Sequence, residues 1–249
     1  MPPLEYHRPR SLAEAVSLLG RAQPLAGGTV LTPGRRRVGA VIDLQDLGLD
    51  WIERSDDTLE LGSGVRLQSL VDSDVVPEIL RESARREAGW NLRNAATLGG
   101  TVAAGDGRSP LLTVLLALRA ELLIEPEGLW VDLDLVLSGR PDSLRSRLMT
   151  SARLRVPAAH GYDQVARTPA DAPIVCVAAA LLPSRPPSVA LGGFGQAPLR
   201  LVAEGGVSRF VQAASLAYSQ AEDAWAGAAY RSEVAGVLVR RTLEGIGLK

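Results

Sequence analysis

The sequence predicts a mixed α/β protein whose organisation changes near Pro157, and three observations support this. A capping box opens a short helix, since Ser11 can accept a hydrogen bond from the first turn and Glu14 can reach back. Short segments of alternating or continuous apolar residues, typical of strands, recur along the chain. A strongly apolar run at 111–118 follows Ser109 and Pro110, a favourable N-cap and first position for a buried helix.

The first half of the chain mixes short strands with helices. The capping box leads into a helix with Leu12, Ala15, Val16 and Leu19 on one face, which Gly20 ends. Strands are expected at 24–26, 40–44 and 59–65, and a helix over about 75–88. Residues 90–100 have no clear period, which predicts an irregular functional or surface loop.

Strands continue at 121–125, 129–133 and 152–156. Beyond Pro157 the chain reads as a separate unit, with strands at 174–182 and 188–192 joined by a proline-rich turn. A Gly/Pro stretch at 192–198 precedes helical segments that run to the end. The last, over about 230–243, places Val234, Val237, Leu238 and Arg241 at helical spacing.

Composition excludes several classes of function. A net charge of -1 argues against nucleic acid or an anionic membrane as a partner. The only lysine is Lys249, so no interior lysine can serve as a Schiff base or general base. The longest apolar runs are much shorter than the roughly 20 residues that span a bilayer, and the N-terminus lacks a signal pattern, so a soluble protein is expected.

With a single cysteine and two histidines, the chain can form few kinds of metal site. Cys176 cannot form a disulfide within the chain or hold an iron–sulfur cluster, which fits a reducing, cytoplasmic compartment. Its apolar neighbours favour a buried structural thiol. His7 and His160 are too few and too far apart for a convincing metal site. Asp43, Asp106, Arg93 and Tyr162 are interpreted as cap, loop or surface residues and not as catalysts.

Two glycine pairs are the candidate ligand-binding elements. One is Ala26-Gly27-Gly28-Thr29 after a predicted strand, and the other is Thr97-Leu98-Gly99-Gly100-Thr101 in the predicted irregular loop. Glycine pairs can turn successive N–H groups toward one concavity, which binds a diphosphate without cationic side chains. Neither element has the dinucleotide-fold or P-loop spacing. Each alone is better explained as a tight turn.

The order of these motifs resembles one known family along nearly the whole chain. The matching segments are, in order, 9–15 (PRSLAEA), 26–29 (AGGT), 42–44 (IDL), 61–63 (LGS), 93–100 (RNAATLGG), 153–157 (RLRVP), 189–193 (VALGG), 230–231 (YR) and 237–241 (VLVRR). Together they resemble the FAD-binding medium subunit of the xanthine dehydrogenase and carbon monoxide dehydrogenase family, the molybdenum hydroxylases. Several short matches in one order are more specific than any single motif.

The resemblance implies an α+β protein with the PCMH-type FAD-binding fold. Two α/β subdomains, 1–53 and 54–156, would enclose the flavin, and 157–249 would form a C-terminal domain of an antiparallel sheet with helices. The chain would carry FAD and no catalytic residue or metal of its own. The implied FAD-binding residues are Pro24, Leu25, Ala26, Gly27, Gly28, Thr29, Val30, Leu31, Thr97, Leu98, Gly99, Gly100, Thr101 and Ser109.

The same resemblance implies a role in a larger oxidoreductase complex. Electrons would come from a [2Fe–2S] small subunit and leave to NAD, a quinone or oxygen. A large subunit with the molybdenum cofactor would perform the hydroxylation, and the complex would be a dimer of heterotrimers in the cytoplasm. The single cysteine agrees with clusters on another chain.

Four positions depart from the family pattern. Thr101 replaces an asparagine or aspartate, Pro110 replaces the aspartate after Ser109, Gln164 replaces a lysine, and Ala172 replaces an aromatic residue. Each lost charged hydrogen bond or stacking contact costs roughly 1–3 kcal/mol of cofactor affinity. A degenerate, flavin-free structural subunit of the same kind of complex is therefore the main alternative. A stand-alone flavin reductase or small-molecule binding domain is a third.

Overall fold

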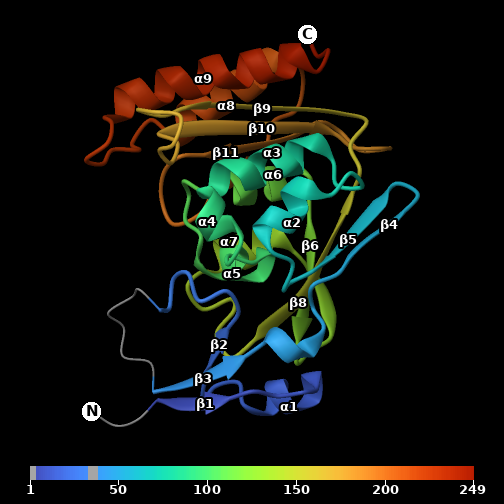
Figure 1. Ribbon diagram of the computed structural model, residues 1–249. Coiled ribbons are helices and arrows are strands. Elements are labelled where there is room, and N and C mark those ends of the chain that lie inside the picture. The colour runs from blue at the N-terminus through green and yellow to red at the C-terminus, as the bar shows by residue number, and fades with distance from the viewer. Residues whose placement is uncertain (1–3, 33–38) are drawn as a thin grey trace.

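Three sheets follow one another along the molecule in the computed structural model, which describes residues 4–32 and 39–249 (Figure 1). The first is parallel, in the order β1 (Glu5–His7), β3 (Ala40–Asp43), β2 (Gln23–Leu25). Helix α1 (Leu12–Ser17) links β1 to β2, and its cap forms as predicted, because Ser11 accepts from the Glu14 amide. A single 3₁₀ turn (Gln45–Leu47) follows β3. Ala15 and Ile42 fill a small separate core here.

The second sheet is antiparallel and has the order β4-β5-β8-β6-β7. These strands are β4 (Ile52–Ser55), β5 (Thr58–Gly62), β8 (Leu148–Arg155), β6 (Glu121–Glu125) and β7 (Leu129–Asp132). Its helices are α2 (Leu67–Asp72), α3 (Glu78–Glu87), α4 (Trp90–Arg93), α5 (Leu98–Ala104), α6 (Pro110–Ala117) and α7 (Leu133–Ser138). The third sheet is also antiparallel, in the order β12 (Leu199–Leu201), β11 (Ser188–Gly192), β10 (Val175–Leu181), β9 (Ala159–Val165), and is followed by α8 (Val207–Ala217) and α9 (Ala228–Gly245).

The third sheet is a middle layer with both faces covered (Figure 1). On one face Ala178, Ala180 and Ala190 pack in the core that contains α6. On the other face Val177 and Leu191 pack in the core of α8 and α9. Burial on both sides explains why β10 is apolar throughout and not alternating.

Most predicted elements are confirmed, and their ends shift by a few residues. The antiparallel sheet with helices predicted for the C-terminal part is present. One prediction is wrong: residues 90–100 are not an irregular loop but contain α4 and the first turn of α5. Sequence reasoning also missed α2, α7, β1, β4, β9 and β12. Arg35, Arg36 and Arg37, which precede β3 in the sequence, lie outside the described residues.

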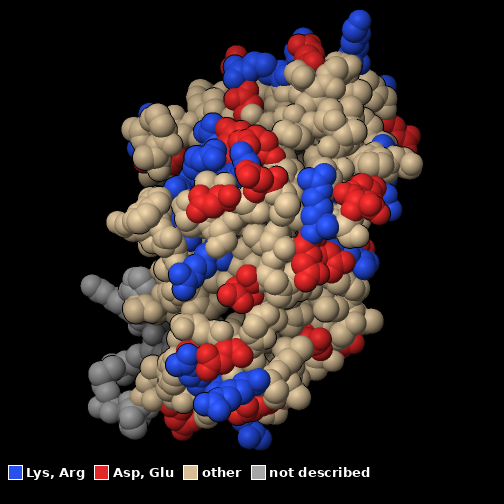
Figure 2. All heavy atoms as spheres, turned by 45° about the vertical axis from the view of Figure 1, so that its right-hand side comes forward, with Lys and Arg blue, Asp and Glu red and all other residues tan. Residues whose placement is uncertain are grey.

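The predicted domain boundaries lie close to changes of sheet. The boundary at 53/54 falls inside β4, which begins at Ile52 and belongs wholly to the second sheet, whereas β8 ends at Arg155, near the boundary at 156/157. No helix in the described part of the chain is long and apolar enough to cross a membrane. Figure 2 shows acidic and basic side chains interspersed over one face, in keeping with a net charge near zero.

Candidate functional site

The first glycine segment is a turn that leaves β2 at the edge of the N-terminal sheet. The chain is anchored there by the Leu44 amide, which donates to the Leu25 carbonyl at 3.0 Å. Gly28 has a φ of 67°, in the left-handed region, and the Thr32 amide donates back to its carbonyl. Within residues 4–32 and 39–249, no amide from Gly27 to Leu31 donates a hydrogen bond. These five donors are therefore available to a ligand from within the described chain.

The two glycine segments lie side by side, although about 70 residues separate them in sequence. A Cβ atom added to Gly27 would lie 1.8 Å from the Ala95 carbonyl oxygen, which is closer than any side chain can approach. Only glycine fits at position 27, because the backbone there contacts the backbone at Ala95, just before the second glycine segment. This adjacency is the condition on which a shared ligand site at the two segments depends.

The second segment does not offer its amides to a ligand, contrary to the expectation that they would face a diphosphate. Thr97 is the N-cap of α5, and its hydroxyl accepts from the Gly100 amide. The Leu98 amide donates to Val65 and the Gly99 amide to Ser63, both at 2.8 Å, while the Thr101 amide donates to the Thr97 carbonyl. The backbone donors of residues 98–101 are thus already used within the protein.

Gly99 has a packing role in the same place. A Cβ atom there would lie 2.8 Å from that of Ser63 and 3.0 Å from the Ser63 carbonyl oxygen. The glycine allows α5 to pack directly on the loop that follows β5. The second segment consequently supplies a rigid wall beside the first one. The Thr101 hydroxyl also donates internally, to the Thr97 carbonyl at 3.1 Å.

Ser109 belongs to the protein core and not to an open cleft. It is buried, caps α6 by accepting from the Leu112 amide, and donates its hydroxyl to Glu87 at 2.8 Å. The same Glu87 oxygen accepts from the Leu111 amide at 3.0 Å. Burial of its carboxyl raises the pKa of Glu87 to about 7, although these two hydrogen bonds favour the charged form. Sequence reasoning placed Ser109 at the cap correctly and missed Glu87.

One departure from the family pattern, Gln164, lies in a polar cluster beside β9 and β10. Tyr162, on β9, donates to the Gln164 side chain at 2.6 Å. Cys176 lies opposite, fully buried, with its sulfur 3.5 Å from the Thr113 hydroxyl. Burial raises the pKa of the Cys176 thiol to about 11. The interpretation of Cys176 as a structural thiol is confirmed in this respect.

The residues interpreted as non-catalytic have structural partners. Arg93 donates to the carbonyls of Arg85 and Ala88 at the end of α3, and also to Gln68. Asp43 is buried and accepts from the Tyr6 hydroxyl, so it is not a surface residue, and it also accepts from the Gln45 amide at 3.0 Å at the start of the 3₁₀ turn, which fits the cap role among those expected. These contacts place neither side chain as a general acid or base.

Backbone hydrogen bonds connect the α5–α6 loop of the second unit to the turn that follows β11 in the third sheet, and no sequence pattern indicated this contact. The Gly107 amide donates to the Gly195 carbonyl at 3.0 Å, and the Gly193 amide donates to the Gly107 carbonyl at 2.6 Å. Arg140 donates to the carbonyls of Val102 and Gly105 at the end of α5. Burial lowers the pKa of Arg140. The connection from α5 to α6 is thus fixed against the C-terminal glycine turn.

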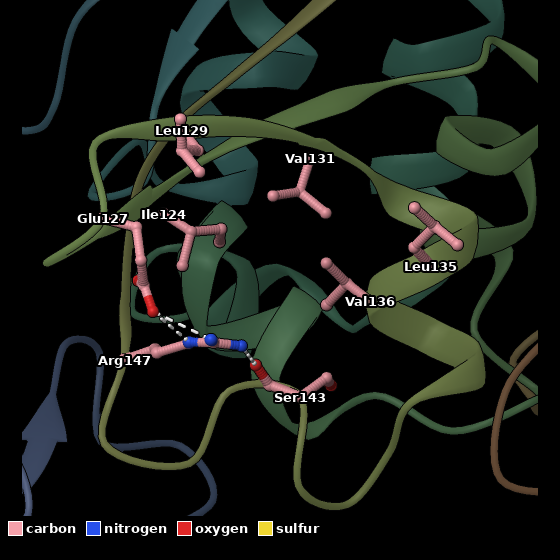
Figure 3. A pocket seen from close by; sticks show the side chains of 8 residues that line it. All are labelled: Ile124, Glu127, Leu129, Val131, Leu135, Val136, Ser143 and Arg147. Atoms are coloured by element: carbon pink, nitrogen blue, oxygen red, sulfur yellow. Dashed lines mark hydrogen bonds and ion pairs between the residues drawn. The ribbon is translucent and has the colours of Figure 1, made fainter.

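A pocket of the described chain lies elsewhere, between the β6–β7 hairpin and α7 (Figure 3). It has a volume of about 260 Å³, and its walls are mainly aliphatic. Its two charged residues, Glu127 and Arg147, pair with each other at 2.8 Å. The pocket therefore presents no unpaired acid or base. Among the described residues, no group of three or more His, Cys, Asp and Glu side chains could hold a metal ion.

Comparison with known proteins connects this geometry to a family. Residues 2–154 match a family model described as the FAD binding domain in molybdopterin dehydrogenase. The chain is 33% identical to the uncharacterized protein YgfM of Escherichia coli (strain K12), over 94% of this chain and 93% of that one. It is 30% identical to the carbon monoxide dehydrogenase medium chain of Hydrogenophaga pseudoflava, over 97% and 96%.

A solved structure of carbon monoxide dehydrogenase from Hydrogenophaga pseudoflava has the same fold. It superposes with a TM-score of 0.83 at 28% identity, covering 99% of this chain and 98% of that one. The similarity extends over all three sheets and not only over the segment matched by the family model.

Proposed function

Because the chain belongs to the family of FAD-binding domains found in molybdopterin dehydrogenases, we propose that it binds FAD and serves as the electron-transfer subunit of a molybdenum hydroxylase complex. Its full-length relatives include medium chains of carbon monoxide dehydrogenases. When bound, the flavin accepts and releases electrons. The observation that carries the proposal is the row of available amides from Gly27 to Leu31 beside the wall formed by α5.

The turn at residues 24–31 fits the diphosphate of FAD. Its five amide donors can bind phosphate oxygens through the main chain, which suits a segment without lysine. Thr97 to Thr101 contribute the surface against which the turn is held, and their role is packing and shape. The Thr29 hydroxyl adds a neutral donor. Ser109 has no place in this cofactor site, because its hydroxyl is committed to Glu87.

The partners we propose follow from what this chain lacks. With one buried cysteine, it cannot hold the [2Fe–2S] clusters through which electrons would arrive. A small iron–sulfur subunit and a large subunit with the molybdenum cofactor would supply these groups, in a dimer of heterotrimers located in the cytoplasm. NAD, a quinone or oxygen would receive the electrons.

A visible absorption spectrum of the complex purified with its subunits tests the proposal. We expect the absorption of oxidised flavin, with about one FAD per copy of this chain. Gly27→Ala should abolish flavin binding and leave the fold intact, because its Cβ would push the turn away from Ala95. The matched control is Gly89→Ala, where an added Cβ has open space and φ is -62°. Equal flavin content in the two variants would contradict the proposed site.

A flavin-free structural subunit is the second candidate function, and specific contacts favour it. The amides of residues 98–101 and the Ser109 hydroxyl are all engaged within the protein, so only one of the two glycine segments can donate. Pro110 occupies the first position of α6, where the family commonly has a carboxylate. A complete complex without flavin absorption would establish this second function.

A further inference from the structure

An exposed tryptophan is flanked by two arginines where three loops meet. Trp225, in the loop between α8 and α9, is 44% exposed. The guanidinium carbon of Arg108, in the loop between α5 and α6, lies 4.3 Å from the centre of the indole. That of Arg167, in the loop between β9 and β10, lies 4.7 Å from the same centre. The three residues are far apart in sequence, so the tertiary fold brings them together.

Neither arginine of this cluster forms an ion pair with a residue of the described chain. The guanidinium group of Arg108 donates only to carbonyls, those of Pro173 at 3.0 Å and Ala172 at 2.7 Å. Arg167 makes no ion pair or hydrogen bond with any residue of 4–32 or 39–249. Two guanidinium groups beside one ring repel each other, and an anion placed next to them would relieve that repulsion. Arginine is also the side chain best suited to bidentate contacts with phosphate.

Four carboxylates lie in the same loops, those of Asp106, Asp171, Glu222 and Asp223, and among the described residues only Asp223 forms an ion pair with an arginine. Asp223 accepts from the buried Arg231 at 2.7 Å and from the Trp225 amide at 2.8 Å. Asp106 accepts from the Arg108 amide, and Asp171 from the Thr168 amide. Asp223 therefore fixes the loop that carries Trp225. In this arrangement Arg167 stays exposed and Arg108 is half-buried.

The cluster continues the proposed flavin site. The turn at 26–31 contacts the segment before α5, α5 leads into the loop that carries Arg108, and Arg108 contacts the loop at 172–173. In Figure 1 these loops follow one side of the molecule, from the end of β2 past α4 and α5 to the start of α9. A molecule bound at Trp225 would lie on the same side as the proposed cofactor.

We propose that Arg108, Arg167 and Trp225 bind a phosphate-bearing nucleotide that acts as the external electron acceptor. This inference rests on the proposed function and narrows it, because a quinone or oxygen carries no charge for the two arginines to bind. The guanidinium groups hold the phosphates, and the indole contacts the planar base. NAD is the acceptor class that combines both features.

Calorimetric titration of the full chain, saturated with FAD, with ADP-ribose tests this site. ADP-ribose carries a base and a diphosphate but no ring that exchanges electrons. Arg167→Gln should weaken its binding roughly fivefold or more, and Trp225→Leu to a similar extent. The matched control is Arg209→Gln, an exposed arginine at the start of α8, near the C-terminus and away from Trp225. Its affinity should equal that of the natural chain.

Absent binding to the natural chain, or equal binding by the Arg167→Gln variant, would overturn the inference. Inorganic pyrophosphate separates the base from the phosphates: if it binds as tightly as ADP-ribose and Trp225→Leu has no effect, the nucleotide assignment is wrong. Flavin content is measured on the same samples. A chain that retains FAD but not ADP-ribose refutes only this inference, whereas a chain without FAD refutes the proposed function, and the Arg167→Gln comparison still decides the nucleotide site.

Discussion

Glu87→Gln should change how the stability of this protein depends on pH. In the native protein the Glu87 carboxyl caps the start of α6 through Ser109 and Leu111, and burial raises its pKa from 4.5 to about 7. As the pH rises above 4.5, the unfolded chain releases this proton while the folded protein keeps it. The free energy of unfolding therefore falls until the pH reaches about 7.

The size of the effect follows from the two pKa values. Each unit of pKa difference corresponds to about 1.4 kcal/mol, so the natural chain should lose roughly 2.5 kcal/mol between pH 5 and pH 8 through this group. Glutamine can still accept from Ser109 and Leu111 through its amide oxygen, and it does not titrate. The variant should thus gain roughly 2.5 kcal/mol relative to the natural chain over that interval.

Urea unfolding at pH 5 and pH 8, followed by circular dichroism, measures this difference. The control is Glu233→Gln, at an exposed position of α9 without an ion pair among the described residues. That variant should follow the natural chain at both pH values. If Glu87→Gln and the natural chain differ by the same amount at pH 5 and pH 8, the carboxyl is not held protonated by burial and the reasoning is refuted.

Three further predictions concern buried or half-buried groups. Arg231→Met should lower the free energy of unfolding by roughly 3–5 kcal/mol in a urea titration, because it leaves Asp223 without its ion pair and the Gly193 carbonyl without its donor; a loss below 1 kcal/mol would contradict this. Cys176 should react with a thiol reagent only after unfolding, and labelling of the native protein would show an exposed thiol. Arg140→Met should increase amide hydrogen exchange at the end of α5. Unchanged exchange would show that the hydrogen bonds from Arg140 to the Val102 and Gly105 carbonyls do not stabilise this end of the helix.

Local signals predicted the elements that local rules control. The capping box at Ser11 and the Ser109-Pro110 pair marked helix starts correctly, because a cap involves only neighbouring residues. The strand at Glu121–Glu125 was expected over the same residues, and its alternation arises from one buried face. The family resemblance supplied the arrangement of sheets, which periodicity alone left at a mixed α/β protein.

The wrong predictions, of an irregular loop at 90–100 and of free amides in its glycine segment, have physical causes. Residues 90–100 appeared irregular because α4 is four residues long and α5 starts with a glycine pair, so neither shows a helical period. The Leu98 amide is bonded to Val65 and the Gly99 amide to Ser63, partners over 30 residues away that no sequence pattern indicates. Glu87, Arg140 and the pairing of Gly107 with Gly193 are likewise products of tertiary contact.

The complete burial of α6 has a consequence for how this protein can be divided. Every residue from Pro110 to Ala117 is buried, and the helix packs between the second-sheet elements and the alanine-rich face of β10 and β11. A fragment that stops at Val156 would expose one side of this apolar helix to water. A fragment that starts at Pro157 would expose Ala178, Ala180 and Ala190. The two parts share a single hydrophobic interior, so neither piece expressed alone should remain folded, and the chain should unfold across that junction as one cooperative unit.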